Sequence, residues 1–165
     1  MATKIEYPLE KVLEVKVKRV EDQERVVKVK LKELEQEEEK LKICEEKRNK
    51  VFQHLQEKYN QLREEIDGGT TSPKVLQMKF YIKDVQEKLE VEEKKVKDQK
   101  EEVVKAEQAL KEAKDELARK RREVDKLKIH RDDWMKERKL EIAKELEKEM
   151  DEIGNITYQL HMRKR

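Results

Sequence analysis

Apolar residues recur every seven positions along two long stretches of this chain. The first stretch has one polar interruption, Arg48, and the second has none. The repeated positions are Leu13, Val20, Val27, Leu34, Leu41, Leu55 and Leu62 in the first stretch, and Val75, Ile82, Leu89, Val96, Val103, Leu110, Leu117 and Val124 in the second. A sustained seven-residue repeat is typical of helices that pack along a narrow apolar seam. The pattern therefore predicts an all-α protein made of two long helices.

A cluster of turn-forming residues, Asp67–Pro73, separates the two stretches. Gly68 and Gly69 can adopt the left-handed conformation that ends a helix. Ser72 suits the N-cap of the next helix, and Pro73 its first position. Because a short connection brings consecutive helices back alongside each other, we expect an antiparallel coiled-coil hairpin.

The expected bounds follow from these residues. Pro8 suits the first turn of a helix, and Gly154 should end or kink the second helix. The prediction is a single helical-hairpin domain over residues 1–165, with helix one over 8–66, a turn over 67–73, and helix two over 74–153 or beyond.

The N-terminal third of the chain also allows a different interpretation. Residues 15–20 and 27–31 alternate valine or leucine with charged residues, and valine favours strands. A β-hairpin over 15–31 is therefore the alternative. The seven-residue repeat runs through both segments without a change of phase, which favours helix.

The repeat also sets a register between the two helices. The seam is expected at 13, 17, 20, 24 and onward to 66 in helix one, and at 75, 78, 82, 85 and onward to 127 in helix two. The numbers of facing residues then sum to 140 or 141. This places Arg48 opposite Glu92 and Glu10 opposite Arg131. A charge within a seam loses hydration and needs a partner, so both pairs support the register as seam ion pairs.

The centre of the hairpin is expected to be its weakest part. The polar seam residues Glu38, Glu45, Arg48, Glu92 and Gln99 all fall there. Each replaces an apolar side chain whose full burial would contribute roughly 1.5–3 kcal/mol. We therefore expect the centre to open more readily than either end.

Helix two is expected to outrun helix one from about residue 132. The seven-residue phase slips after Val124, which locally unwinds a supercoil. The apolar residues beyond this point have no partner within the hairpin, and they are Trp134, Met135, Leu140, Ile142, Leu146, Met150, Ile153, Ile156 and Leu160. An uncovered apolar helix face commonly binds a groove or another helix, so this overhang is the main candidate for partner binding. Folding back or dimerisation is the alternative.

Two smaller groups of residues are further candidates for partner contact. Val12 and Val15 lie off the seam near the overhang, and Phe80 and Tyr81 lie beside the turn. A short basic run, Arg119–Arg122, could hold phosphate or an acidic partner, but acidic neighbours favour a solvated helix face.

Composition narrows the function classes. Half of the residues are charged and 35% are hydrophobic, which a two-helix seam tolerates and a globular core does not. The net charge of +2 argues against a nucleic-acid binder, and the periodic apolar residues argue against disorder. The single cysteine, Cys44, fits a reducing cytosol. No run of about 20 apolar residues predicts a membrane span, and no signal peptide is recognisable.

Catalysis is not expected. The three histidines are too scattered to hold a metal, and no nucleophile and base occur together. We therefore predict a non-enzymatic, cytoplasmic protein without a cofactor.

Pro8, the Asp67–Pro73 turn and the apolar Trp134–Leu160 tail together resemble the YscO/FliJ family of type III secretion and flagellar export. The resemblance extends over the whole chain and rests on architecture, because the family has no sharp motif. It implies a central stalk whose termini-bearing end enters a hexameric secretion ATPase. The end near Phe80 and Tyr81 would then face an export-gate protein at the membrane. The resemblance also implies contacts with secretion chaperones.

Other functions remain open at this point. The first alternative is a homodimeric coiled-coil scaffold without an ATPase partner, although a monomer is the expected state. The second is a nucleic-acid-binding arm that uses Arg119–Arg122 and residues 163–165.

Overall fold

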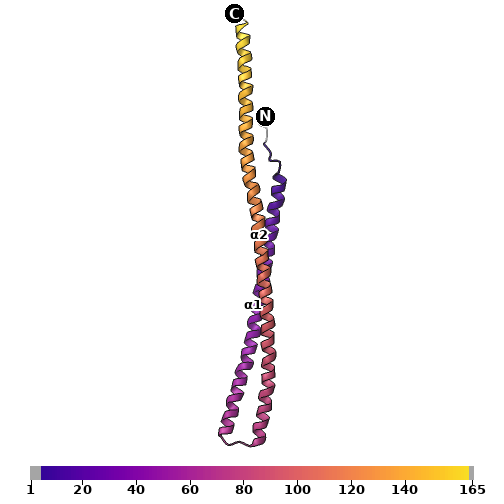
Figure 1. Cartoon of the computed structure of the whole chain (residues 1–165), viewed down its shortest axis with the longest axis vertical. Helices are drawn as coiled ribbons and strands as arrows, with labels where there is room; N and C mark the ends of the chain where they lie inside the picture. Colours follow the sequence, from indigo (N-terminus) through magenta and orange to yellow (C-terminus); the bar gives the residue numbers. More distant parts are fainter. Residues whose placement is uncertain (1–4, 164–165) are drawn as a thin grey trace. The chain divides into compact units, whose positions relative to one another are not determined.

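The computed structural model describes residues 5–163 and contains two helices in the described part of the chain (Figure 1). Helix α1 spans Glu10–Asp67, and α2 spans Ser72–Met162. The all-α prediction is confirmed. None of the helices formed by the described residues has a segment apolar and long enough to span a membrane.

Both helix starts differ from the expected bounds: α1 begins at Glu10 rather than at residue 8, and α2 begins at Ser72 rather than at residue 74. Helix α2 continues through Gly154 to Met162, so the helix does not end at this glycine and instead runs beyond residue 153, which the expected bounds allowed. A Cβ at Gly154 would meet no atom within 4 Å, which means that no close packing requires glycine there. A lone glycine lowers helix propensity by about 1 kcal/mol, and the favourable residues around it outweigh this cost.

The segment 15–31 is helical, and the β-hairpin alternative is wrong. Helix formation places Leu13, Val17, Val20 and Val27 along one face, where each is buried or half-buried. A strand would send successive side chains to opposite faces and could not bury this seven-residue set together.

The turn closes as a helix C-cap followed by a new helix start. The amide of Gly68 donates to the carbonyl of Glu64 at 2.9 Å, and that of Thr70 donates to the carbonyl of Glu65 at 3.2 Å. Gly69 has φ 77°, a conformation that strains residues with a Cβ. The carbonyl of Thr71 accepts from the amide of Val75, so Thr71 caps α2 one residue earlier than expected.

The chain divides into two compact units, which we describe separately. The first holds residues 5–24 and 116–163 of the described chain, and the second holds 25–115. Each consists of one segment of α1 paired with one segment of α2.

The unit formed by residues 25–115 has its core near the turn. Leu55, Leu62, Ile82 and Val85 form a buried cluster, with Val85 only 2% exposed. Val51, Val75, Met78 and Leu89 pack against it. In the other unit, Leu13, Leu117 and Val124 are buried together with Tyr7.

The seam predicted for α2 is confirmed, because every position from 75 to 127 in that series is buried or half-buried. The seam predicted for α1 is only partly right. Five of its expected members are exposed, and they are Leu31, Glu38, Phe52, Tyr59 and Ile66. Near the turn the seam instead uses the residues one position earlier, Val51, Lys58 and Glu65.

Contacts with α2 accompany this shift of the α1 seam at Lys58 and Glu65. Lys58 Nζ lies 5.6 Å from the centre of the Tyr81 ring, and Glu65 Oε2 lies 2.7 Å from Lys74 Nζ. A long charged side chain can lay its stem along the seam and keep its charged end in water beside a partner. The bulky residues one position later then flank the interface.

Candidate partner-binding site

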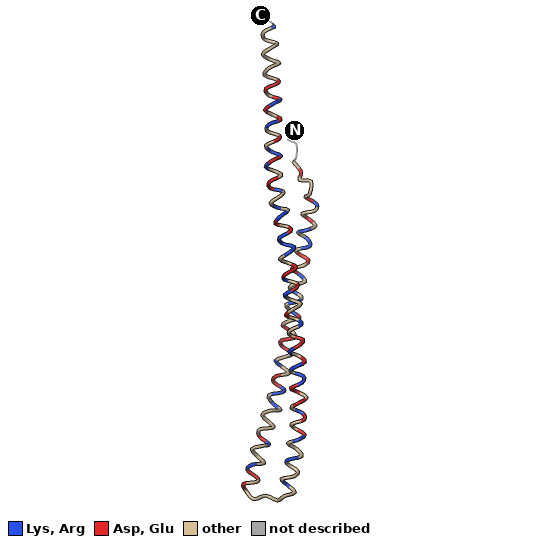
Figure 2. The backbone as a smooth tube through the Cα atoms, viewed as in Figure 1, with Lys and Arg blue, Asp and Glu red and all other residues tan. Residues whose placement is uncertain are grey.

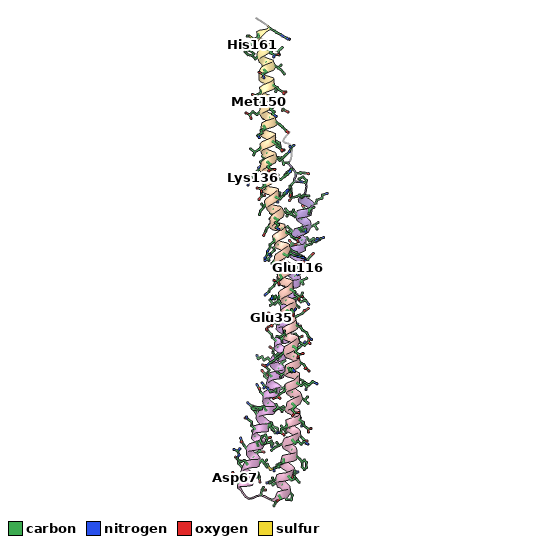
Figure 3. The ribbon with its side chains drawn as sticks, viewed as in Figure 1. Glu35, Asp67, Glu116, Lys136, Met150 and His161 are labelled. Atoms are coloured by element: carbon green, nitrogen blue, oxygen red, sulfur yellow. The ribbon has the colours of Figure 1, made fainter. Side chains whose placement is uncertain are left out.

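The last part of α2 extends past the start of α1 and exposes large apolar side chains. Figure 3 labels Met150 in this part, and its side chain is 65% exposed. Leu146 and Ile153 are 58% and 59% exposed. At 3.6 residues per turn, five apolar side chains share one side of the helix. We call them the apolar face of α2: Ile142, Leu146, Met150, Ile153 and Leu160.

Residues 5–163 supply no cover for most of this face. A single surface helix normally buries its apolar stripe against another element. Here Ile142 is half-buried, and the later members are exposed. Isolated exposed leucines need no explanation, but a continuous stripe of this kind is typical of a binding surface.

The beginning of the overhang is covered, contrary to expectation. Trp134 and Met135 are half-buried, because residues 5–9 run beside α2 before α1 begins. Tyr7 is only 5% exposed. Its ring lies edge-on to Trp134, with centroids 5.6 Å apart, and its hydroxyl lies 2.5 Å from Nδ1 of His130. We call residues 5–9 the strap.

Sequence reasoning missed Tyr7. The signal that could have found it is an aromatic residue immediately before Pro8 at the helix start, where an apolar side chain commonly packs back onto the fold. The carbonyl of Tyr7 accepts from the amide of Glu10 at 3.1 Å, so this residue also begins the first turn of α1.

Ion pairs join α1 and α2 next to the strap. Arg131 Nη1 lies 3.7 Å from Glu10 Oε1, as the register expects of facing residues. The hydrogen bond from Lys16 to Glu123 lowers the pKa of the Glu123 carboxyl. Both ion pairs are partly exposed, and solvent screening keeps the contribution of such pairs to stability small. These ion pairs set which residues of α1 and α2 face each other beside the overhang, more than they add to the stability of the fold.

Val12 and Val15 are exposed on α1, at 45% and 52%. They belong to the same unit as the apolar face of α2, but they do not line the hollow that Ile5, Trp134 and Ile142 share. They remain a separate candidate surface.

At the turn, the two aromatic candidates have different surroundings. Phe80 is 63% exposed. The hydroxyl of Tyr81 lies 3.0 Å from Nε2 of His54, and Lys58 Nζ sits 5.6 Å from the centre of the Tyr81 ring. Tyr81 therefore belongs to a cross-helix cluster, whereas Phe80 is free for contact.

The expected ion pair between Arg48 and Glu92 is wrong. Glu92 Oε1 pairs instead with Lys95, at 2.7 Å along the same helix. Arg48 Nε and Glu92 Oε2 are both buried atoms without a hydrogen-bond partner. The i,i+3 spacing gives Lys95 a local route to the carboxylate that costs less ordering than a cross-helix reach.

The basic run 119–122 is largely neutralised locally. Arg119 pairs with Glu116 at 2.7 Å and Arg121 with Glu24 at 2.7 Å, while Lys120 donates to Gln23 at 2.9 Å. Along both helices, basic and acidic residues alternate over short distances (Figure 2). A solvated, ion-paired surface accounts for this run.

No group of three or more potential ligands that could hold a metal occurs among residues 5–163. The described residues form a coiled-coil seam and expose apolar side chains on α2, an arrangement suited to protein contacts.

The sequence model of the YscO-like protein family matches residues 4–164, nearly the whole chain. The chain belongs to the YscO-like family, a family of structural proteins associated with type III secretion. It is also similar to the solved structure of CT670 from Chlamydia trachomatis, which is described as a proposed YscO homolog. The two share 47% identity with a TM-score of 0.95, over 98% of this chain and 100% of the other. No curated protein matches the sequence.

Proposed function

We propose that this protein is a non-enzymatic coupling stalk of a type III secretion system, and that it binds the hexameric secretion ATPase through the apolar face of α2. The observation that carries the proposal is the exposed stripe from Leu146 to Leu160. It lies at the end of the chain where both termini are found, which is the end that the YscO/FliJ resemblance assigns to the ATPase ring.

The physical basis is the unfavourable contact of this stripe with water. Each large apolar side chain gains roughly 1.5–3 kcal/mol when a partner buries it fully. The four exposed members of the face, Leu146, Met150, Ile153 and Leu160, would together contribute at most roughly 6–12 kcal/mol, which is comparable to the cost of association. A helix seated in an apolar bore or groove is the recognition mode that fits this geometry.

The other proposed partners are an export-gate protein and secretion chaperones. Phe80 is the exposed aromatic beside the turn and is the proposed contact for the gate. The proposed location is the cytoplasmic side of the membrane secretion apparatus.

Binding to the cognate ATPase tests the proposal. We expect the two proteins to co-elute in size-exclusion chromatography, and we expect the chain to stimulate ATP turnover. The double variant Leu146→Asp/Ile153→Asp should weaken binding by at least about a hundredfold, because two apolar contacts are replaced by charges.

A matched control lies on the opposite side of the same helix. Asn155→Asp/Gln159→Asp adds the same charge at two exposed positions, and we expect it to bind as the wild type does. Equal loss in both variants, or no loss in either, contradicts the assignment of the face. A concentration-dependent dimer in sedimentation, without ATPase binding, would favour the homodimeric scaffold.

A further inference from the structure

The strap is the feature of this molecule that helix pairing leaves unexplained. It precedes α1, has no helical or strand structure of its own, and still buries an aromatic ring almost completely. We propose that residues 5–9 are a releasable cover over the Trp134 end of the apolar face of α2, closed in this structure. Opening the strap would add Trp134 and the flank of Ile142 to the surface that a partner can reach.

Three contacts hold the strap closed. The Tyr7 ring packs edge-on to Trp134, and it also lies 5.7 Å from the ring of His130. The Tyr7 hydroxyl completes a hydrogen bond with the imidazole of His130. All three contacts are made by Tyr7, which is the most deeply buried residue of the strap.

The strap lies in line with the apolar face. Ile5 and Glu6 line one side of a hollow of about 380 Å³, and Trp134, Ile142 and Leu146 line the other. Ile142 and Leu146 are members of the apolar face, so the strap covers the point where this face begins. The first residue of the face is half-buried, and the next is 58% exposed.

Tyr7 is the buried side chain of the strap, Ile5 is half-buried, and residues 6, 8 and 9 are exposed. Ordering five residues outside a helix costs backbone entropy at each of them. The buried Tyr7 ring and its hydrogen bond to His130 contribute to offsetting that cost. Segments with few buried contacts open at free energies well below that of global unfolding. The Tyr7–Pro8 turn limits the motion, because Pro8 fixes its own φ and leads directly into α1.

The strap is a property of the free protein, and its test needs no ATPase. Trp134 is the only tryptophan of the chain and reports directly on the contact. In Tyr7→Ala, we expect its emission to shift to the red, acrylamide to quench it more strongly, and the apolar dye bis-ANS to bind more. Helicity measured by circular dichroism should stay at the wild-type level.

Tyr158→Ala is the matched control. It makes the same chemical change on α2 at a position 64% exposed, about 36 Å along the helix from Trp134. We expect no change in tryptophan emission. Unchanged Trp134 emission and quenching in Tyr7→Ala would overturn the closed strap.

Two further measurements decide whether the cover releases. If Tyr7→Ala lowers helicity, the variant Tyr7→Phe is used in its place, because it keeps the ring and removes the hydrogen bond to His130. We expect Tyr7→Phe to raise acrylamide quenching of Trp134 by less than Tyr7→Ala does. No rise in quenching would overturn the proposal. In wild-type protein, heating should raise acrylamide quenching of Trp134 before ellipticity at 222 nm is lost. Coincident transitions would show fixed packing and overturn the release.

Discussion

Gln99 of α2 donates its side-chain amide to the carboxylate of Glu37 on α1, at 2.5 Å, and to the backbone carbonyl of the same residue at 3.2 Å. It is a cross-helix hydrogen bond in the polar centre of the seam. Val96 and Val103, the seam positions on either side of Gln99, are buried. A polar residue therefore occupies a site that the repeat would otherwise fill with an apolar one.

We expect Gln99→Leu to stabilise the hairpin by about 1 kcal/mol. The half-buried leucine extends the apolar seam, and Glu37 can return to water because its carboxylate is at the edge of the seam. Thermal unfolding followed by circular dichroism measures the change. Gln108→Leu, at an exposed position of α2, is the control and should leave stability nearly unchanged. A lower Tm in Gln99→Leu than in this control contradicts the expectation.

The same contact predicts a pH dependence. Hydrogen bonds from Lys40 and then Gln99 lower the pKa of the Glu37 carboxyl in the folded protein. A carboxyl whose folded pKa is depressed contributes stability above its unfolded pKa, which is about 4.3, and loses that contribution as the pH falls through the folded pKa. Glu37→Gln should therefore lower Tm at pH 7, and its difference from wild type should vanish in acid below that range. Glu39→Gln, at an exposed position of the same helix, should show no such convergence. A Glu37→Gln deficit that persists at the lowest pH would contradict the mechanism.

Core packing near the turn predicts a large effect at Val85. This residue is 2% exposed and belongs to the cluster with Leu55 and Ile82. Val85→Ala should destabilise the protein by about 1–3 kcal/mol, from lost burial and an incompletely filled cavity. Val91→Ala on the same helix, where the side chain is 53% exposed, should cost under about 0.5 kcal/mol. Similar losses of unfolding free energy in Val85→Ala and Val91→Ala, measured by chemical denaturation, would mean that the cluster does not form the core.

Two glycines should respond to alanine with opposite signs. Gly69 has φ 77°, so Gly69→Ala forces a side chain into a left-handed conformation and should cost about 1–2 kcal/mol. Gly154 is helical and has open space around its Cβ position, so Gly154→Ala should stabilise the end of α2 by about 0.5–1 kcal/mol. Denaturant midpoints report the first change, and amide exchange around residue 154 reports the second. Faster exchange in Gly154→Ala would indicate that the glycine is required there.

The contrast between the two helices shows how much of the fold the sequence alone could predict. In α2, leucines and valines recur at the seam positions, and no other face of the helix has a comparable apolar repeat. The predicted seam is confirmed throughout this helix. In α1, the seven-residue repeat predicts Phe52 and Tyr59 as the seam residues, yet Val51 and Lys58 are half-buried and both aromatic residues are exposed. At Lys58 and Glu65 the side chains meet partners on α2, Tyr81 and Lys74, and a pattern of apolar positions within one helix does not contain that information.

The candidate site could also be predicted only in part. The exposed residues from Leu146 onward follow from the unequal lengths of the two helices, which the repeat already indicates. The covering of Trp134 by Tyr7 could not be predicted, because it depends on the turn at Pro8 and Leu9 and on the distance from that turn to α2. Similarly, Glu92 has both Lys95 and Arg48 within plausible reach, and spacing alone does not rank a local partner against a distant one.

If the strap and the ATPase compete for the same end of α2, releasing the strap should strengthen the complex. The apparent Kd equals the intrinsic Kd divided by the fraction of molecules that are open. For a strap closed about ten to one, Tyr7→Ala should therefore tighten binding to the cognate ATPase by about tenfold. Isothermal titration at equal protein concentrations measures this, with Tyr158→Ala as the control. Weaker binding in Tyr7→Ala, with the loss in Leu146→Asp/Ile153→Asp intact, would instead mean that Tyr7 contacts the ATPase itself.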